Sequence, residues 1–380
     1  MTTGVRRVLM AHPSAELYGS DRMFAESVAA LAERGWRVVV ALPDDGPLVA
    51  AVSEYAEVVR CATPVLRKAA LRPVGMARLA AEAVRATGPA SRLLRRLRPD
   101  LVYVNTVTVP QWIALARLHR VPVLTHVHEA EDDVPGPVRA ALSAPLLAAN
   151  AVVVNSEAAR RSITRPFPRL ARRSRLVYNG VASPTGPAEL PEAAPSPVRL
   201  VLVGRLSPRK GTDIAVAAVE RLCRDGLDVT LDLVGSVFPG YEWYQRQLEE
   251  QIRDAGLDGR VRLHGFTADV GRAYACADLA LVPSRVEPFG NTAVEAQLAG
   301  LPVIVSDAQG LPETVDGGAH GTVVPRDDPA ALAGAVREAV ACWQATRRRA
   351  VEAALLARER FAPERYRHEL AGVAAELADR

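Results

Sequence analysis

The sequence contains few cysteines and no long apolar run. Its four cysteines are widely scattered and form no Cys-x-x-Cys pair, which excludes a disulfide framework and a cysteine-rich zinc site. No apolar stretch approaches the roughly 18 residues that a membrane-spanning helix needs. The apolar run Val8 to Ala11, which follows two arginines, is too short for the core of a signal peptide. We therefore expect a cytoplasmic protein.

Signatures of nucleic-acid and metal binding are also missing. No helix-turn-helix, zinc-finger or aromatic stacking motif is present, so we expect no nucleic-acid partner. No clear Asp-x-Asp element indicates metal-assisted binding of a diphosphate. His126 and His128, followed by four acidic residues up to Asp133, could form a metal site, but these carboxylates have no matching ligand spacing. We expect no metal and no cofactor.

The sequence does contain a long alternation of strand-like and helical segments. Its 380 residues suffice for two domains of about 150 residues each. Short apolar runs such as Leu101 to Asn105 alternate with helical periods, and the pattern restarts at Arg199 to Val203. This alternation predicts parallel sheets covered by helices on both faces. Residues 183–197 hold five prolines and no periodicity, which is typical of a hinge.

The predicted organisation is therefore α/β, with two αβα domains facing one another across a ligand cleft. The first domain spans residues 1–182, the hinge residues 183–197 and the second domain residues 198–363. The tail is helical apart from an interruption at Pro363. We expect its last helix, about residues 364–380, to pack back on the first domain.

Positive charge is concentrated in the first half. The net charge is only +4, yet residues 1–180 hold 25 Lys and Arg against 15 Asp and Glu. Residues 60–98 contain ten basic residues and one acid, Glu82, with arginines at helical spacing among Ala and Leu. Such a helix could rest on an anionic membrane, its arginines at the lipid phosphates and its apolar side dipping in. The alternative is a solvated face of an arginine-rich protein.

The most informative segment runs from Ser284 to Asp307. Its apolar ends predict a strand, a loop, a short helix and a second strand, with a Gly-x-Pro sequence ending the helix. Glu287 and Glu295 flank the glycine-containing turn that opens this helix. The loop would lie at the carboxyl end of a parallel strand, where open sheets bind ligands, and a helix start suits a phosphate. We predict a sugar-nucleotide site.

A structural role for the two glutamates is also open. Thr292, Ala293, Val294 and Glu295 form a capping-box sequence, in which Glu295 would tie down its own helix. Glu287 would then be a solvated loop residue.

A second loop is basic and follows the strand that ends at Gly204. Arg205, Arg209 and Lys210 lie in it before the next helix, with no acidic residue among them. We expect this loop at the same sheet edge as Glu287. An arginine fork and a lysine point charge can together neutralise a departing diphosphate, although a basic loop without a ligand remains the alternative.

Together these segments resemble the retaining glycosyltransferases of family 4, which have the GT-B fold of two Rossmann-like αβα domains facing across a cleft. The resemblance covers nearly the whole chain. It rests on motifs in a fixed order: Asn155-Ser156-Glu157, Tyr178-Asn179-Gly180-Val181, Gly204-Arg205 with Lys210-Gly211, His264-Gly265-Phe266, Glu287 and Glu295 with Pro288-Phe289-Gly290 between them, and Leu311-Pro312-Glu313.

By resemblance, the second domain binds the donor and the first lies on the acceptor side. Arg205 and Lys210 would hold the donor diphosphate, Glu295 the ribose and Glu287 a hydroxyl of the sugar. The resemblance implies further donor contacts for Gly19, Gly204, Gly265, Phe266, Phe289, Gly290, Asn291 and Thr292. Gly19 belongs to a segment similar to the family's first glycine loop, in which Tyr18 replaces the first glycine of the usual pair.

The remaining catalytic candidate is a histidine. His126 and His128 end a predicted strand, and their spacing of two puts both rings on one face of that strand. In the family a histidine at this place reaches the reacting sugar. His128 fits it better than His126, which would be a packed neighbour. The implied catalytic set is completed by Glu287, Arg205 and Lys210.

The resemblance implies that the protein moves a sugar from a nucleoside-diphosphate (NDP) sugar to an acceptor hydroxyl with retention of configuration. The acceptor would be a glycan, a lipid-linked molecule or a small molecule, in the synthesis of cell-envelope glycan, glycolipid or natural-product glycosides. Residues 60–98 would place the enzyme peripherally at the inner face of the cell membrane. The alternatives are an NDP-sugar epimerase or hydrolase of the same fold, and a non-catalytic membrane-docked module of a glycan-assembly complex.

Overall fold

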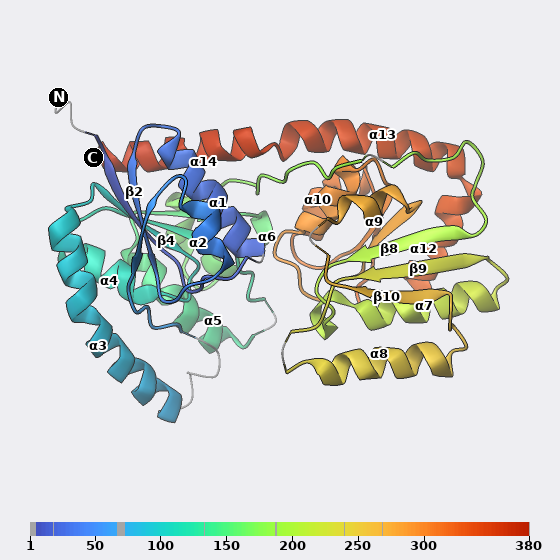
Figure 1. Cartoon of the computed structure of the whole chain (residues 1–380), viewed down its shortest axis with the longest axis horizontal. Helices are drawn as coiled ribbons and strands as arrows, with labels where there is room; N and C mark the ends of the chain where they lie inside the picture. Colours follow the sequence, from blue (N-terminus) through green and yellow to red (C-terminus); the bar gives the residue numbers. More distant parts are fainter. Residues whose placement is uncertain are drawn as a thin grey trace. The chain divides into compact units, whose positions relative to one another are not determined.

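The computed structural model describes residues 5–17, 19–66, 73–132, 134–186, 188–238, 240–267 and 269–379. The chain divides into two compact units (Figure 1). Unit 1 comprises Met1–Gly180 and Pro363–Arg380, and unit 2 comprises Val181–Ala362.

Unit 1 is a parallel sheet with helices on both faces. Its strands, in the spatial order β3-β2-β1-β4-β5-β6-β7, are β1 Arg7–Ala11, β2 Arg37–Leu42, β3 Glu57–Arg60, β4 Leu101–Asn105, β5 Val123–Val127, β6 Ala151–Val154 and β7 Ser174–Leu176. Its helices are α1 Gly19–Ala32, α2 Pro47–Val52, α3 Pro73–Leu97, α4 Pro110–Leu118, α5 Gly136–Ser143, α6 Glu157–Thr164 and α14 Pro363–Ala378.

The strands of unit 1 are apolar because helices cover both faces of the sheet. On one face Phe24 of α1 and Tyr366 of α14 join the core, and α1 and α14 pack against each other (Figure 1). On the other face Trp112 of α4 and Leu94 of α3 are buried. The strand order reverses between β1 and β4, so their carboxyl ends form a topological switch point, where open α/β sheets bind ligands.

Unit 2 repeats this architecture. Its strands, in the spatial order β10-β9-β8-β11-β12-β13, are β8 Val198–Val203, β9 Val229–Val234, β10 Val261–Gly265, β11 Leu279–Val282, β12 Val303–Ser306 and β13 Thr322–Val324. Its helices are α7 Thr212–Arg224, α8 Glu242–Asp254, α9 Gly271–Ala275, α10 Asn291–Leu298, α11 Leu311–Thr314, α12 Pro329–Ala341 and α13 Trp343–Arg360. The strand order reverses between β8 and β11, which gives this unit its own switch point.

Most elements lie where the periodicity predicts them, and the helical tail is interrupted at Pro363 as expected. The elements that the pattern missed include β3, whose four residues begin and end with charged side chains, the short strand β13, short helices such as α2 and α5, and the longer helix α12. Asp328 caps α12, since its side chain accepts hydrogen bonds from the backbone N–H groups of Ala330 and Ala331 at 2.9 and 2.8 Å. The Asp-Pro sequence at this helix start is a local signal that could have identified it.

The helix predicted within residues 60–98 is confirmed as α3, and residues 67–72 lie outside the described residues. Within the described chain, no helix combines the length and the apolar character needed to cross a membrane. The four cysteines form no disulfide, as their spacing predicts.

Candidate functional site

Two loops meet at the switch point of unit 2. The loop after β8 carries Gly204 to Gly211, and the loop after β11 carries Pro283 to Gly290. Gly211 has a φ of 67°, and a Cβ atom at this position would lie 2.0 Å from the carbonyl oxygen of Pro283. Only glycine therefore lets the loops approach this closely. The backbone N–H of Arg285 donates to the carbonyl of Arg209 at 2.8 Å, which fixes one loop against the other.

This meeting of loops brings Lys210 to Glu287. The Lys210 ammonium donates a hydrogen bond to Oε2 of Glu287 and forms an ion pair with it. The Glu287 side chain is 13% exposed and that of Lys210 26% exposed, so solvent reaches both. Lys210 is also one of only two lysines among 47 basic residues. In so arginine-rich a chain, this choice is a sequence signal for a compact point charge at this position.

Arg205 lies in the same loop as Lys210. Its guanidinium carbon stands 3.0 Å from the centroid of the Phe238 ring, so the cation stacks on an aromatic face. The backbone N–H of Leu206 donates to the carbonyl of Ser236 at 3.1 Å, which joins the loop after β8 to the loop after β9. Arg205 is thus held at the edge of the sheet where Lys210 and Glu287 meet.

Helix α10 begins at Asn291, as the sequence predicts, but without a capping box. Gly290 precedes the helix as its N-cap residue with a φ of 115° and has no side chain that could cap it. Thr292 therefore lies inside the first turn and not at the N-cap, so residues 292–295 do not form the capping box that their sequence suggests. A Cβ atom on residue 290 would lie 2.5 Å from Leu311 Cδ2 and 3.6 Å from Glu287 Cγ. The positive end of the helix dipole lies next to Glu287 as a result.

Glu295 accepts a hydrogen bond from a tyrosine of helix α9. The Tyr274 hydroxyl donates to its Oε2 at 3.2 Å, and the same hydroxyl lies 3.3 Å from the carbonyl oxygen of Thr292. Burial and the neighbouring Glu295 charge raise the pKa of Tyr274 well above its usual value. Tyr274 therefore keeps its proton and remains a donor that orients Glu295.

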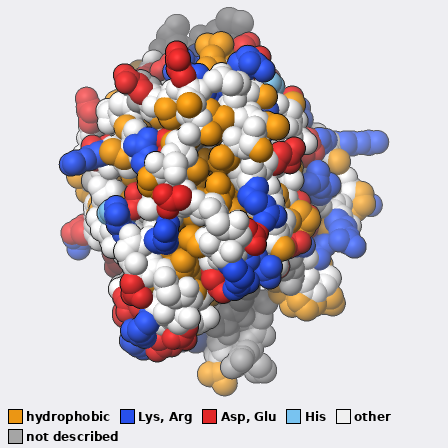
Figure 2. Space-filling view, turned by 90° about the vertical axis from the view of Figure 1, so that its right-hand side faces the viewer, with side chains coloured by type: hydrophobic (Ala, Val, Ile, Leu, Met, Phe, Trp, Pro, Cys, Tyr) orange, Lys and Arg blue, Asp and Glu red, His pale blue; other side chains and the backbone are white. Residues whose placement is uncertain are grey.

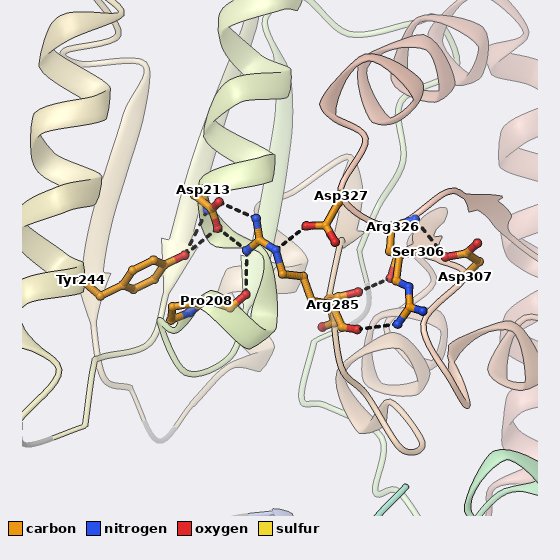
Figure 3. A network of polar contacts seen from close by, with 9 residues as sticks. Pro208, Asp213, Tyr244, Arg285, Ser306, Asp307, Arg326 and Asp327 are labelled. Atoms are coloured by element: carbon orange, nitrogen blue, oxygen red, sulfur yellow. Dashed lines mark hydrogen bonds and ion pairs between the residues drawn. The ribbon is translucent and has the colours of Figure 1, made fainter. Parts of the chain in front are cut away.

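A further network, which the sequence did not reveal, centres on Arg285 (Figure 3). Its guanidinium donates to both carboxylate oxygens of Asp213 at 2.8 and 2.7 Å and to the carbonyl of Pro208 at 2.7 Å. It also pairs with Asp327, and the Tyr244 hydroxyl donates to Asp213 at 2.8 Å. Arg285 therefore holds the short turn Pro208–Lys210 in place. The one local signal was Asp213 in the first turn of α7.

In unit 1, His128 follows β5 next to the switch point. The rings of His126 and His128 lie with their centroids 4.0 Å apart, so both occupy one face, as predicted. His126 is fully buried, and its Nδ1 is 2.7 Å from the Tyr103 hydroxyl. His128 Nε2 lies 2.9 Å from Oδ1 of Asn105. Burial lowers the pKa of His128 to about 3, which keeps this ring neutral.

Other predicted contacts in unit 1 are few. Gly19 is the first residue of α1, and Tyr18 lies outside the described residues. Among the residues that the structure describes, no group of three or more His, Cys, Asp and Glu side chains is arranged to hold a metal ion. Asp133, the last of the acidic residues after His128, is also outside the described set.

Two family models match the chain, one for each sheet. The model described as Glycosyltransferase Family 4 matches residues 18–183, and the model described as Glycosyl transferases group 1 matches residues 197–341. The chain belongs to glycosyltransferase family 4.

Curated relatives of this family 4 chain include the glycogen synthase of Mycobacterium tuberculosis, which is 32% identical over 269 residues. The match covers 67% of the chain and 64% of the relative, so the chain spans less than two thirds of that protein. The D-inositol 3-phosphate glycosyltransferase of Corynebacterium kroppenstedtii is 35% identical over 145 residues, which cover 36% of the chain and 32% of the relative.

Solved structures confirm the GT-B fold with its two Rossmann-like units. Anabaena Alr3699/HepE, solved in complex with UDP-glucose, is 24% identical, with a TM-score of 0.81 over 98% of this chain and 100% of that one. The sucrose-phosphate synthase of Thermosynechococcus elongatus is 21% identical, with a TM-score of 0.77 over 98% and 99%.

The remaining predicted contacts of this family 4 member lie on loops of unit 2. Gly204 directly follows β8 and Gly265 ends β10, where the carbonyl of Gly265 accepts from the backbone N–H of Gly235 at 2.8 Å. Phe266 is 74% exposed, as a residue beside a ligand would be. Phe289 is buried, with its ring edge-on to Phe361 at 5.6 Å between centroids. The side chain of Phe289 therefore packs inside unit 2 and does not line an exposed surface.

Proposed function

We propose that this chain transfers a glycosyl group from an NDP-sugar, with UDP-glucose as the first donor to test, to an acceptor hydroxyl with retention of configuration. The observation that carries the proposal is the Lys210–Glu287 pair at a switch point, beside the start of α10, where glycine is the N-cap residue. A diphosphate and a sugar hydroxyl need these two kinds of group side by side. The HepE structure in complex with UDP-glucose, a protein of the same fold, supports the choice of donor.

Electrostatics supplies the chemistry of this site. As the bond between sugar and diphosphate breaks, negative charge grows on the departing phosphate, and Arg205, Lys210 and the N-terminus of α10 stabilise it. Glu287 accepts a hydrogen bond from a donor hydroxyl and orients the sugar. Two cations and a helix dipole provide the positive charge that a metal would otherwise bring, so the reaction needs no metal.

Retention follows from the family resemblance. The acceptor hydroxyl attacks on the face that the diphosphate leaves, and the departing phosphate takes its proton. Glu287 is engaged by Lys210 and is not assigned as a covalent nucleophile. By the same resemblance, His128 is the residue assigned to the reacting sugar. The configuration at the anomeric carbon of the product, read by nuclear magnetic resonance (NMR), decides between retention and inversion.

A membrane-proximal acceptor is the finer part of the proposal. Along α3, Val74, Met76 and Val84 are exposed next to the exposed arginines Arg78 and Arg85. Apolar side chains beside arginines suit the interface of an anionic bilayer. Figure 2 looks onto unit 2, where acidic and basic side chains are interspersed. The exposed apolar side chains among arginines on α3, compared with the mixed charges on this face of unit 2, favour α3 as the element that faces the membrane. A lipid-linked or glycan acceptor would suit that position.

The scarcity of lysine permits a direct test of the donor site. A Lys68→Arg variant leaves Lys210 as the single lysine, so amine acylation of this variant reports on one side chain. We expect UDP to slow acylation of Lys210, measured by peptide mass spectrometry, and UDP-glucose to raise the thermal midpoint. A donor panel with other bases and sugars extends the thermal measurement. If no nucleotide sugar protected Lys210 or stabilised the protein, the donor site would be rejected.

Product analysis separates the rival functions. A glycosyltransferase releases UDP from UDP-glucose slowly alone and faster with an accepted lipid or glycan extract. Free glucose or an epimerised nucleotide sugar formed at full rate without acceptor would identify the hydrolase or epimerase. An Arg205→Ala/Lys210→Ala variant that kept full cellular function would identify the non-catalytic module.

A further inference from the structure

Buried side chains at the carboxyl ends of β1 and β4 form a series of hydrogen bonds that leads from Asp21 to His128. Asp21 Oδ1 lies 2.5 Å from His12 Nε2, His12 Nδ1 lies 2.9 Å from Asn105 Nδ2, and Asn105 Oδ1 lies 2.9 Å from His128 Nε2. His12 and Asn105 are fully buried, and Asp21 is 3% exposed. His12 follows β1, Asn105 ends β4 and His128 follows β5, so the switch point itself brings them together.

The charge of Asp21 determines which atom donates and which accepts in each of these hydrogen bonds. A carboxylate only accepts hydrogen bonds. Nε2 of His12 therefore carries a hydrogen and donates a hydrogen bond to Oδ1 of Asp21. Ser14 Oγ donates to the same oxygen at 3.1 Å. The Asn105 amide nitrogen, which can only donate, faces Nδ1 of His12 at 2.9 Å, so Nδ1 is the acceptor and His12 carries its hydrogen on Nε2 alone.

Asn105 extends this order of donors and acceptors to His128. Because its amide nitrogen faces His12, its oxygen faces His128 and accepts from Nε2–H. The Tyr103 hydroxyl, which can donate or accept, lies 3.4 Å from the same amide oxygen. Nδ1 of His128 then carries no hydrogen and can accept a hydrogen bond. Within the described residues it has no hydrogen-bond partner.

We infer that Asp21, His12 and Asn105 are positioning residues that hold His128 in the Nε2–H tautomer, so that its Nδ1 accepts a hydrogen bond from a sugar hydroxyl. The tautomer of one histidine nitrogen is set by the bond of the other. In the opposite tautomer Nδ1 would carry a hydrogen and repel a donating hydroxyl hydrogen. This inference rests on the proposed contact of His128 with the reacting sugar.

An Asp21→Asn substitution reverses this series of hydrogen bonds. The new amide can donate to His12 Nε2, which moves the His12 proton to Nδ1, turns the Asn105 amide over and leaves His128 protonated on Nδ1. Full-length protein labelled with ¹⁵N-histidine reports each ring by NMR. We expect the Nε2–H form of His128 in the wild type and a shift toward the Nδ1–H form in the variant. Asp45→Asn, which removes an exposed carboxylate paired with Arg60, is the matched control.

A second substitution distinguishes positioning from general damage. In Asp21→Asn/Asn105→Asp the new carboxylate accepts from His128 directly, so the Nε2–H form returns although Asp21 is still absent. For UDP-glucose, we expect Asp21→Asn to lower kcat by on the order of ten-fold to a hundred-fold, with a smaller change in KM. The Asp45→Asn control keeps both values.

The outcomes are separable from those of the proposed function. A wild-type His128 that carries its proton on Nδ1 overturns the inference without any variant. A His128 tautomer that is indifferent to Asp21→Asn does the same. If UDP-glucose neither binds nor reacts, the proposed function fails. The tautomer measurement still decides whether Asp21, His12 and Asn105 position His128.

Discussion

Lys210 and Glu287 form an ion pair although 77 positions separate them in the sequence. The pairing arises because β8 and β11 are neighbours in the sheet and Gly211 lets their loops touch. It joins the group assigned to the diphosphate with the group assigned to the sugar. Both side chains remain partly exposed, so a donor can exchange the ion pair for its own phosphate and hydroxyl contacts.

Substitution of Glu287 with Gln tests its role in transfer. We expect UDP-glucose turnover to fall by about 100-fold, because the amide cannot replace the charge beside Lys210. The free energy of unfolding should change by no more than about 1 kcal/mol, since the pair is partly exposed. Glu220→Gln, which breaks the exposed Arg224–Glu220 pair, should alter neither quantity. Wild-type turnover in Glu287→Gln would contradict the assignment.

Arg285 should prove structural. Arg285→Ala leaves Asp213 and the Pro208 carbonyl without their donor, and we expect a loss of about 2 kcal/mol in the free energy of unfolding. Arg285→Lys should recover little of it, because an ammonium cannot make the bidentate contact. Chemical denaturation measures both. Arg337→Ala, which removes an exposed pair with Asp225, should cost about 0.5 kcal/mol or less. Equal losses in the two alanine variants would argue against the network.

Tyr274→Phe should weaken donor binding more than catalysis. The variant keeps the ring and removes the hydrogen bond to Glu295, which is assigned to the ribose. We expect KM for UDP-glucose to rise by roughly three-fold to ten-fold, in line with a net hydrogen bond of about 1 kcal/mol, and kcat to stay near the wild-type value. Tyr55→Phe, at an exposed tyrosine of unit 1, serves as the control. A fall in kcat without a rise in KM would refute the ribose assignment.

Glu129 should make stability depend on pH. Burial raises the pKa of this carboxyl, which follows His128, from 4.5 to about 7. The folded state therefore holds a proton that the unfolded state has released, and the contribution of Glu129 to stability falls as pH rises from 4.5 to about 7. Glu129→Gln lacks this term. The unfolding free energy of the wild type minus that of the variant should decrease across this window, and a constant difference would contradict the shift.

Membrane docking through α3 should depend on its arginines. Arg85→Glu/Arg92→Glu should weaken binding to phosphatidylserine vesicles in co-sedimentation by at least about 2 kcal/mol, or roughly 30-fold, because two attractive charges are lost and two repulsive ones are added. Arg221→Glu/Arg337→Glu changes unit 2 by the same charge and should have no effect. Binding of the wild type that ignores both salt and anionic lipid would reject a membrane role for α3.

The sequence predicted the loops of the candidate site because each is local. A strand, a glycine, a basic run and a helix start lie within a few residues around Gly204 and Lys210, and the same holds around Glu287. The assignment of helix α10 was right but its cap was wrong, since Gly290 starts the helix before Thr292. Gly290 and the Thr-x-x-Glu sequence lie close together, so the sequence alone could not show which of them marks the helix start.

Side-chain contacts that depend on the order of strands in a sheet could not be predicted from the sequence. Arg285 and Asp213 meet across β8 and β11, and Asp21, His12 and Asn105 meet only because β1 and β4 are neighbours. One general signal was available: His12 and Asn105 are polar residues at the carboxyl ends of apolar strands. A polar residue in that place is a candidate for a switch-point contact before any partner is known.

Unit 1 is discontinuous in the chain, and this bears on the order in which a ribosome can complete the protein. Tyr366 and Leu370 of α14 belong to the same core as Phe24 of α1, so that core stays open until residues beyond 363 have been synthesised. Unit 2, which is continuous from Val181 to Ala362, is complete earlier. A nascent chain should therefore finish its second sheet first, while the first exposes the apolar surface that α14 later covers.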